Sequence, residues 1–114
     1  MAKLLCKKRG ELADVRKLFL DHLSALGSSA ELAGCYSFED HWFGVIEKYY
    51  MRAGSYASLS IHLYQHNDEV YLEAIGAGGG AGMFNISWGS EGSFIKKLES
   101  LLKTQHFVFL DCET

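Results

Sequence analysis

The clearest structural pattern in this chain is the stretch YASLSIHLYQHNDEVYLEAI, residues 56–75. From Tyr56 to Tyr64, small or apolar residues at the odd positions alternate with ring-bearing or hydroxyl-bearing residues at the even positions. A period of two is typical of a strand with one buried face. The alternation resumes after Asn67-Asp68, a pair that suits a two-residue hairpin loop. The stretch therefore predicts an antiparallel hairpin.

A two-residue loop fixes the register of the hairpin by counting outward from it. Leu63 then pairs with Leu72 on the core face. The other face carries three pairs of ring or carboxylate side chains: His66 with Glu69, Tyr64 with Tyr71, and His62 with Glu73.

The flanking sequence supplies the remaining elements. Apolar residues recur at helical spacing in residues 10–26 and in residues 94–102. Further strands are predicted at residues 31–38, 43–52, 83–88 and 106–110. Together these elements predict a single α+β domain spanning residues 1–114. Its mainly antiparallel sheet has about five strands, with an N-terminal and a C-terminal helix packed on one face.

Composition excludes several classes of protein. The net charge of −3 and the absence of any basic run longer than Lys7-Lys8-Arg9 argue against a nucleic-acid partner. No apolar stretch approaches 18 residues, so we expect no membrane span, and no signal peptide is evident. The chain has 48% hydrophobic residues and is 13% aromatic, more rings than a core of this size needs. Trp42 and Trp88 either fill the core or line a pocket or interface.

Three cysteines, Cys6, Cys35 and Cys112, are odd in number and lack the spacing of a zinc site. They predict idle thiols in a reducing cytoplasm rather than a disulfide framework. We expect no metal and no cofactor.

Five of the twelve glycines lie in Gly76-Ala-Gly-Gly-Gly-Ala-Gly82. Such a cluster favours a mobile or tightly turned connection between strands. It lacks the Gly-Lys-Ser/Thr ending of a phosphate-binding loop, and an extended segment rather than a helix follows it. Ligand binding through exposed amides of Gly78, Gly79 and Gly80 remains an alternative.

The polar face of the hairpin is the second candidate site. It gathers His62, Tyr64, Tyr71 and Glu73, which are residue types that serve acid–base chemistry or ligand binding. Two histidines four residues apart on a strand lie about 13 Å from each other, too far to share one zinc ion. A solvated face, or one covered by a second subunit, is the simpler interpretation.

The stretch Ala74-Ile-Gly-Ala-Gly-Gly-Gly80, followed by Trp88-Gly-Ser-Glu-Gly-Ser-Phe94, resembles the C-terminal part of a small bacterial family of unknown function. The resemblance covers about a third of the chain and implies a bacterial cytoplasmic protein. It implies no catalytic residues.

We therefore expect a non-catalytic interaction module that forms a homo-oligomer through its aromatic sheet face. The alternative is a small-molecule or anion site built from residues 76–82 and the face of His62, Tyr64, Tyr71 and Glu73. An enzyme that uses His62 and Glu73 as an acid–base pair is the third and weakest possibility.

Overall fold

The computed structural model describes residues 3–50, 54–78 and 94–113. Six strands, two α-helices and one short 3-10 helix follow one another along the described chain. In order they are β1 (Lys3–Arg9), α1 (Leu12–Asp21), the 3-10 helix η1 (Leu23–Leu26), β2 (Glu31–Phe38), β3 (His41–Tyr50), β4 (Ser55–His66), β5 (Glu69–Gly78), α2 (Phe94–Thr104) and β6 (Val108–Glu113).

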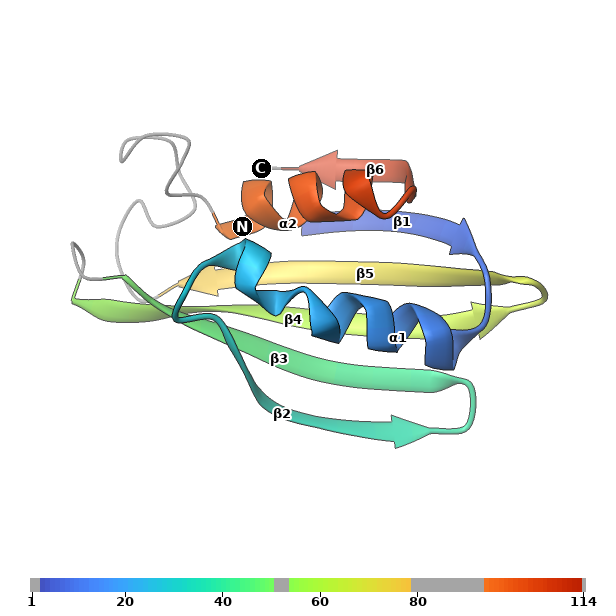
Figure 1. Ribbon diagram of the computed structural model, residues 1–114, viewed down its shortest axis with the longest axis horizontal. Coiled ribbons are helices and arrows are strands. Elements are labelled where there is room, and N and C mark those ends of the chain that lie inside the picture. The colour runs from blue at the N-terminus through green and yellow to red at the C-terminus, as the bar shows by residue number, and fades with distance from the viewer. Residues whose placement is uncertain (1–2, 51–53, 79–93, 114) are drawn as a thin grey trace.

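The six strands form one antiparallel sheet in the order β2-β3-β4-β5-β1-β6 (Figure 1). The predicted α+β class and mainly antiparallel sheet are confirmed. The described residues form six strands rather than about five, because β1 was not predicted. The helices are not terminal elements either, since β1 precedes α1 and β6 follows α2.

The sequence pattern does not predict strand β1, because four of its seven residues are cationic. Its core-facing residues Leu4 and Cys6 are nonetheless fully or nearly fully buried. Lys8, next on that side, reaches past the core, and its ammonium group donates to the carbonyl oxygen of Gln105 over 2.7 Å. A long aliphatic stem allows a lysine to occupy such a position.

The predicted hairpin register is confirmed in full. β4 and β5 pair His66 with Glu69, Tyr64 with Tyr71, Leu63 with Leu72, and His62 with Glu73. Asn67, in the turn, has a φ of 57°, the left-handed conformation that its side chain tolerates.

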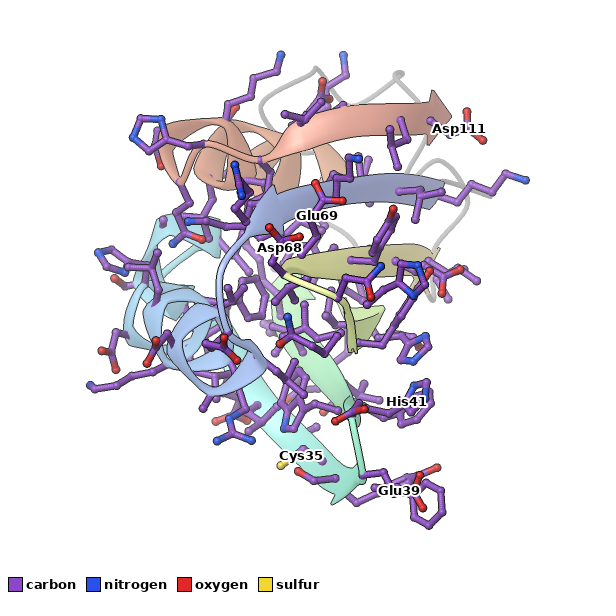
Figure 2. The ribbon with its side chains drawn as sticks, turned by 90° about the vertical axis from the view of Figure 1, so that its right-hand side faces the viewer. Cys35, Glu39, His41, Asp68, Glu69 and Asp111 are labelled. Atoms are coloured by element: carbon purple, nitrogen blue, oxygen red, sulfur yellow. The ribbon has the colours of Figure 1, made fainter. Side chains whose placement is uncertain are left out.

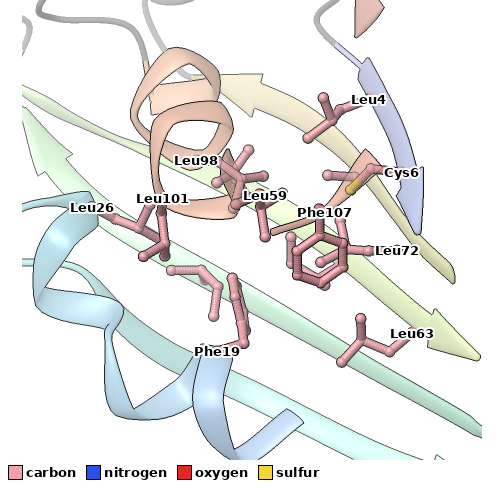
Figure 3. Packing of buried hydrophobic residues seen from close by; sticks show 14 of the residues in the cluster. Leu4, Cys6, Phe19, Leu26, Leu59, Leu63, Leu72, Leu98, Leu101 and Phe107 are labelled. Atoms are coloured by element: carbon pink, nitrogen blue, oxygen red, sulfur yellow. The ribbon is translucent and has the colours of Figure 1, made fainter. Parts of the chain in front are cut away.

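The hydrophobic core lies where the helices meet the apolar residues of the hairpin (Figure 3). β4 and β5 contribute side chains that are at most 2% exposed: Ala57, Leu59, Ile61, Leu63, Val70, Leu72 and Ala74. The helical segments contribute Val15, Phe19, Leu26, Phe94, Ile95, Leu98, Leu101 and Leu102. Trp42 belongs to the same cluster, so core filling is its role.

Two other expectations are refined. The helical pattern of residues 10–26 divides into α1 and η1, and Gly27 follows with a φ of 137°. Gly76, Ala77 and Gly78 are the last three residues of β5 rather than part of a loop. The strand expected at 83–88 lies outside the described residues. No helix in the described part of the chain is long and apolar enough to cross a membrane.

Candidate binding surface

The side chains of β2 to β5 that point away from the core form a surface rich in rings, here called the ring face. It follows from strand alternation, since residues two apart share a face and paired residues stand side by side. Its members are Tyr36, Phe38, His41, Phe43, Tyr49, Tyr56, His62, Tyr64 and Tyr71. In Figure 2, His41 projects on the side of the sheet away from α1.

Two rows of the ring face cross the strands. The first row runs from β2 to β5 as Tyr36, Phe43, His62 and Glu73. The second, one pair nearer the hairpin turns, runs from β2 to β1 as Phe38, His41, Tyr64, Tyr71 and Lys7.

Three rings of each row are stacked: Tyr36, Phe43 and His62 in the first row, and His41, Tyr64 and Tyr71 in the second. Phe43 and His62 are almost parallel, with an interplanar angle of 2° and ring centroids 4.3 Å apart. Tyr36 continues this stack at 5.3 Å from Phe43. In the second row, the Tyr64 and Tyr71 centroids lie 5.2 Å apart. Stacking of this kind orders large side chains before any partner arrives.

A hydrogen-bonded chain joins the two rows. Nδ1 of His62 lies 3.0 Å from Oε1 of Glu73, and Nε2 of His62 lies 2.9 Å from Nδ1 of His41. Because an ionised carboxylate only accepts, His62 donates its Nδ1–H to Glu73. A neutral His62 then accepts at Nε2 from the Nδ1–H of His41. Both nitrogens of His62 are therefore engaged, and its ring orientation is fixed.

Electrostatic effects on this face are local. Partial burial raises the pKa of the Tyr64 hydroxyl, and the charges of Glu73 and Tyr71 add to the effect. The Lys7 ammonium group lies 3.2 Å from Oε1 of Glu69, and this hydrogen bond raises the pKa of Lys7. Lys7 also lies 5.8 Å from the centroid of the Tyr71 ring. This lysine is thus already engaged within the sheet.

A hollow of about 660 Å³ opens on the ring face beside the first row. Its position follows from side-chain size. The neighbouring row across β2 to β5 is Gly34, Val45, Ser60 and Ile75, and two of these residues are small. The full lining is Ala33, Gly34, Cys35, Tyr36, Phe43, Gly44, Val45, Ser60, Ile61, His62, Glu73 and Ile75.

The site residues predicted from sequence fall into two groups. His62, Tyr64, Tyr71 and Glu73 come together as the hairpin register required. Gly78 ends β5, opposite Ala57, while Gly79 and Gly80 lie outside the described residues.

Sequence reasoning missed the contribution of β2 and β3. Tyr36, His41 and Phe43 join the site because Glu39 and Asp40 form a second two-residue turn, which pairs Phe38 with His41. Counting outward from that turn gives the pair of Tyr36 with Phe43, so the signal was present. Among the described residues, no group of three or more His, Cys, Asp or Glu side chains is placed to hold a metal ion.

Comparison with known proteins gives a family but no activity. No curated protein and no solved structure matches the chain. A family model matches residues 1–106, nearly the whole chain, and its description is a family of unknown function, DUF6054. The chain therefore belongs to this family of unknown function, as the resemblance in its C-terminal half implied.

Proposed function

We propose that this protein is a non-catalytic binding module that self-associates through the ring face. The supporting observation is the exposure of large ring side chains: Tyr36 is 65% exposed, Phe38 64% and Tyr56 57%. Monomeric proteins rarely leave contiguous apolar patches uncovered. A two-fold dimer with ring faces in contact is the simplest assembly that covers them, since it uses one self-complementary surface.

The ring face is free for such a contact if both helices cover the opposite face of the sheet. This arrangement is supported by the single buried cluster that the helices share with the core-facing residues of β4 and β5. The view in Figure 1, with α1 and α2 drawn across the sheet, agrees with it. A bacterial cytoplasm is part of the same proposal, and the exposed free thiol of Cys35 fits a reducing compartment.

The test of self-association is the absolute mass in solution, measured by light scattering over a wide range of concentration. We expect a dimer or larger assembly that Tyr36→Glu weakens at least about tenfold, because a carboxylate would be buried in the contact. Ala13→Glu, on the exposed surface of α1, adds the same charge elsewhere and leaves the mass unchanged. A wild-type protein that stays monomeric throughout contradicts the proposal.

A small-molecule site is the second candidate function, and the hollow beside the first row favours it. Its volume of about 660 Å³ lies within the range of roughly 300–1,000 Å³ typical of ligand pockets. Apolar side chains dominate its lining, with a few polar groups among them, as in such pockets. A ligand that fills the hollow raises the melting temperature at unchanged mass, because it binds only the folded chain.

A further inference from the structure

We propose that the hollow binds an organic cation, a protonated amine carried on an apolar body, and that Glu73 accepts hydrogen bonds from the ammonium group. The proposal rests on the second candidate function, the small-molecule site, and names its ligand class. It replaces an anion as the expected ligand of this part of the ring face.

The charge of the lining points to a cation. Among the described residues that line the hollow, Glu73 carries the only carboxylate, and none is Lys or Arg. An anion in the hollow would therefore meet a like charge with no lining cation to offset it. Lys3 stands opposite Ile75 on β1, outside the lining, and Lys7 is bound to Glu69.

The Glu73 carboxylate is oriented by a hydrogen bond and can still accept a donor from the ligand. Its Oε1 accepts the His62 Nδ1–H over 3.0 Å, which holds the carboxylate at the wall of the hollow. A carboxylate offers about four lone-pair sites, so Oε2 remains for a ligand. The side chain is 50% exposed, and a donor can reach it from solvent. Hydrogen bonds between two charged groups are about twice as strong as neutral ones.

The rest of the hollow suits an apolar body. Val45, Ser60 and Ile75 line it from one row of the sheet. Phe43 lines it from the next row, stacked between Tyr36 and His62. Tyr36 and His62 cover the two faces of the Phe43 ring. The apolar body of the ligand would therefore contact ring edges and aliphatic side chains. Edge contacts of this type favour an aromatic ligand whose face meets the ring edge.

The test uses three probes that share a naphthyl ring: naphthylethylamine, naphthylethanol and naphthylacetate. Each is titrated into the protein in mildly alkaline buffer, where free imidazoles are neutral, and backbone amide shifts are followed by NMR. We expect the amine to bind at least about tenfold tighter than the alcohol, and the carboxylate to bind most weakly. Light scattering of the same samples shows whether a probe also changes the mass.

Three variants separate the ligand class from the site. Glu73→Gln is expected to remove the tenfold advantage of the amine over the alcohol. Glu69→Gln, four residues away on β5 and outside the lining, keeps that advantage and is the matched control. Ser60→Phe fills part of the hollow and is expected to abolish binding of all three probes.

Each outcome decides between the two ideas. A carboxylate that binds as tightly as the amine, or an amine affinity unchanged in Glu73→Gln, overturns the cationic ligand class. If the ligand class fails in this way but Ser60→Phe still abolishes probe binding, the hollow remains a small-molecule site. Amine binding that survives Ser60→Phe lies elsewhere on the protein, and failure of all three probes to bind overturns both the ligand class and the site.

Discussion

At the scale of single residues, β4 carries two polar side chains that act on opposite faces of the sheet. On the ring face, His62 uses both ring nitrogens to connect His41 with Glu73. On the other side, the Gln65 side chain binds the start of α1: its Oε1 accepts from the Leu12 N–H over 2.7 Å, and its Nε2 donates to the Gly10 carbonyl over 2.9 Å. His62, at the candidate ligand site, and Gln65, which caps α1, are thus only three residues apart on β4.

Gln65 is expected to be a large single contributor to stability among the polar residues. Glu11, at the N-cap position of α1, makes no side-chain capping bond, so Gln65 satisfies a helix N–H from a distant strand. Gln65→Leu is expected to lower the free energy of unfolding by about 1–3 kcal/mol, measured by urea denaturation. Gln65→Glu keeps an acceptor for Leu12 but places a carboxylate oxygen against the three carbonyl oxygens to which Nε2 donates, so it should cost at least as much. A Gln65→Leu variant as stable as the wild type would show that these hydrogen bonds do not stabilise the fold.

Lys48 predicts an increase of stability with pH. Burial, followed by the nearby charge of Lys97, lowers its pKa from the ordinary 10.5 to about 8. Between about pH 8 and 10.5 the unfolded chain therefore holds a proton that the folded protein has released, and stability rises across that window. Below about pH 8, Lys48 is protonated in both states, so its titration no longer changes the stability.

The measurement is urea unfolding of the wild type and Lys48→Met at several alkaline pH values. The difference between the two proteins isolates the contribution of Lys48 from that of the other groups in the chain. We expect the wild type to gain stability relative to the variant as the pH rises. A difference that does not change with pH would count against a lowered pKa.

At the scale of elements, β2 is an edge strand with an irregular backbone. Its pairing with β3 shifts register between Leu32 and Gly34, which marks a β-bulge, and most of its side chains are exposed. Bulges bend edge strands and discourage pairing with another chain. We therefore place self-association on the ring face rather than on the free edge of β2.

The neighbouring strand β3 contains a glycine that the core requires. A Cβ atom built on Gly44 would meet the buried indole ring of Trp42, two residues earlier on the same side of the strand. Gly44→Ala is therefore expected to destabilise the protein by about 1–3 kcal/mol through overpacking, measured by thermal or urea unfolding. Gly34→Ala is the matched control, since a Cβ there meets nothing within 4 Å.

The cause can be checked by enlarging the space. Trp42→Phe combined with Gly44→Ala should cost less than the sum of the two single changes, because the smaller ring leaves room for the methyl group. Additive losses would show that Gly44 matters for its backbone rather than for the Trp42 contact.

At the scale of the whole molecule, the sequence predicts what depends on neighbours along the chain. The hairpin of β4 and β5, and with it His62, Tyr64, Tyr71 and Glu73, follows from alternation and one short turn. The hollow cannot be predicted from neighbours along the chain, because four strands, β2 to β5, line it. Its shape also depends on the bulge in β2, which the alternation of the sequence does not indicate. The sequence does not predict β1 for another reason. Its cationic residues obscure the alternation of its two buried side chains, and its partner strands lie far along the chain.

The place of β1 inside the sheet also shapes how the nascent chain matures. Lys3 of β1 is synthesised before both of its strand partners: Ile75 is made roughly seventy residues later, and Glu113 later still. At roughly 5–20 residues per second, the first strand waits about 4–14 seconds for β5. The strands β2 to β5 pair with sequential neighbours and can form their meander in that interval. The sheet is complete only when β1 inserts between β5 and β6, both of which are synthesised after it.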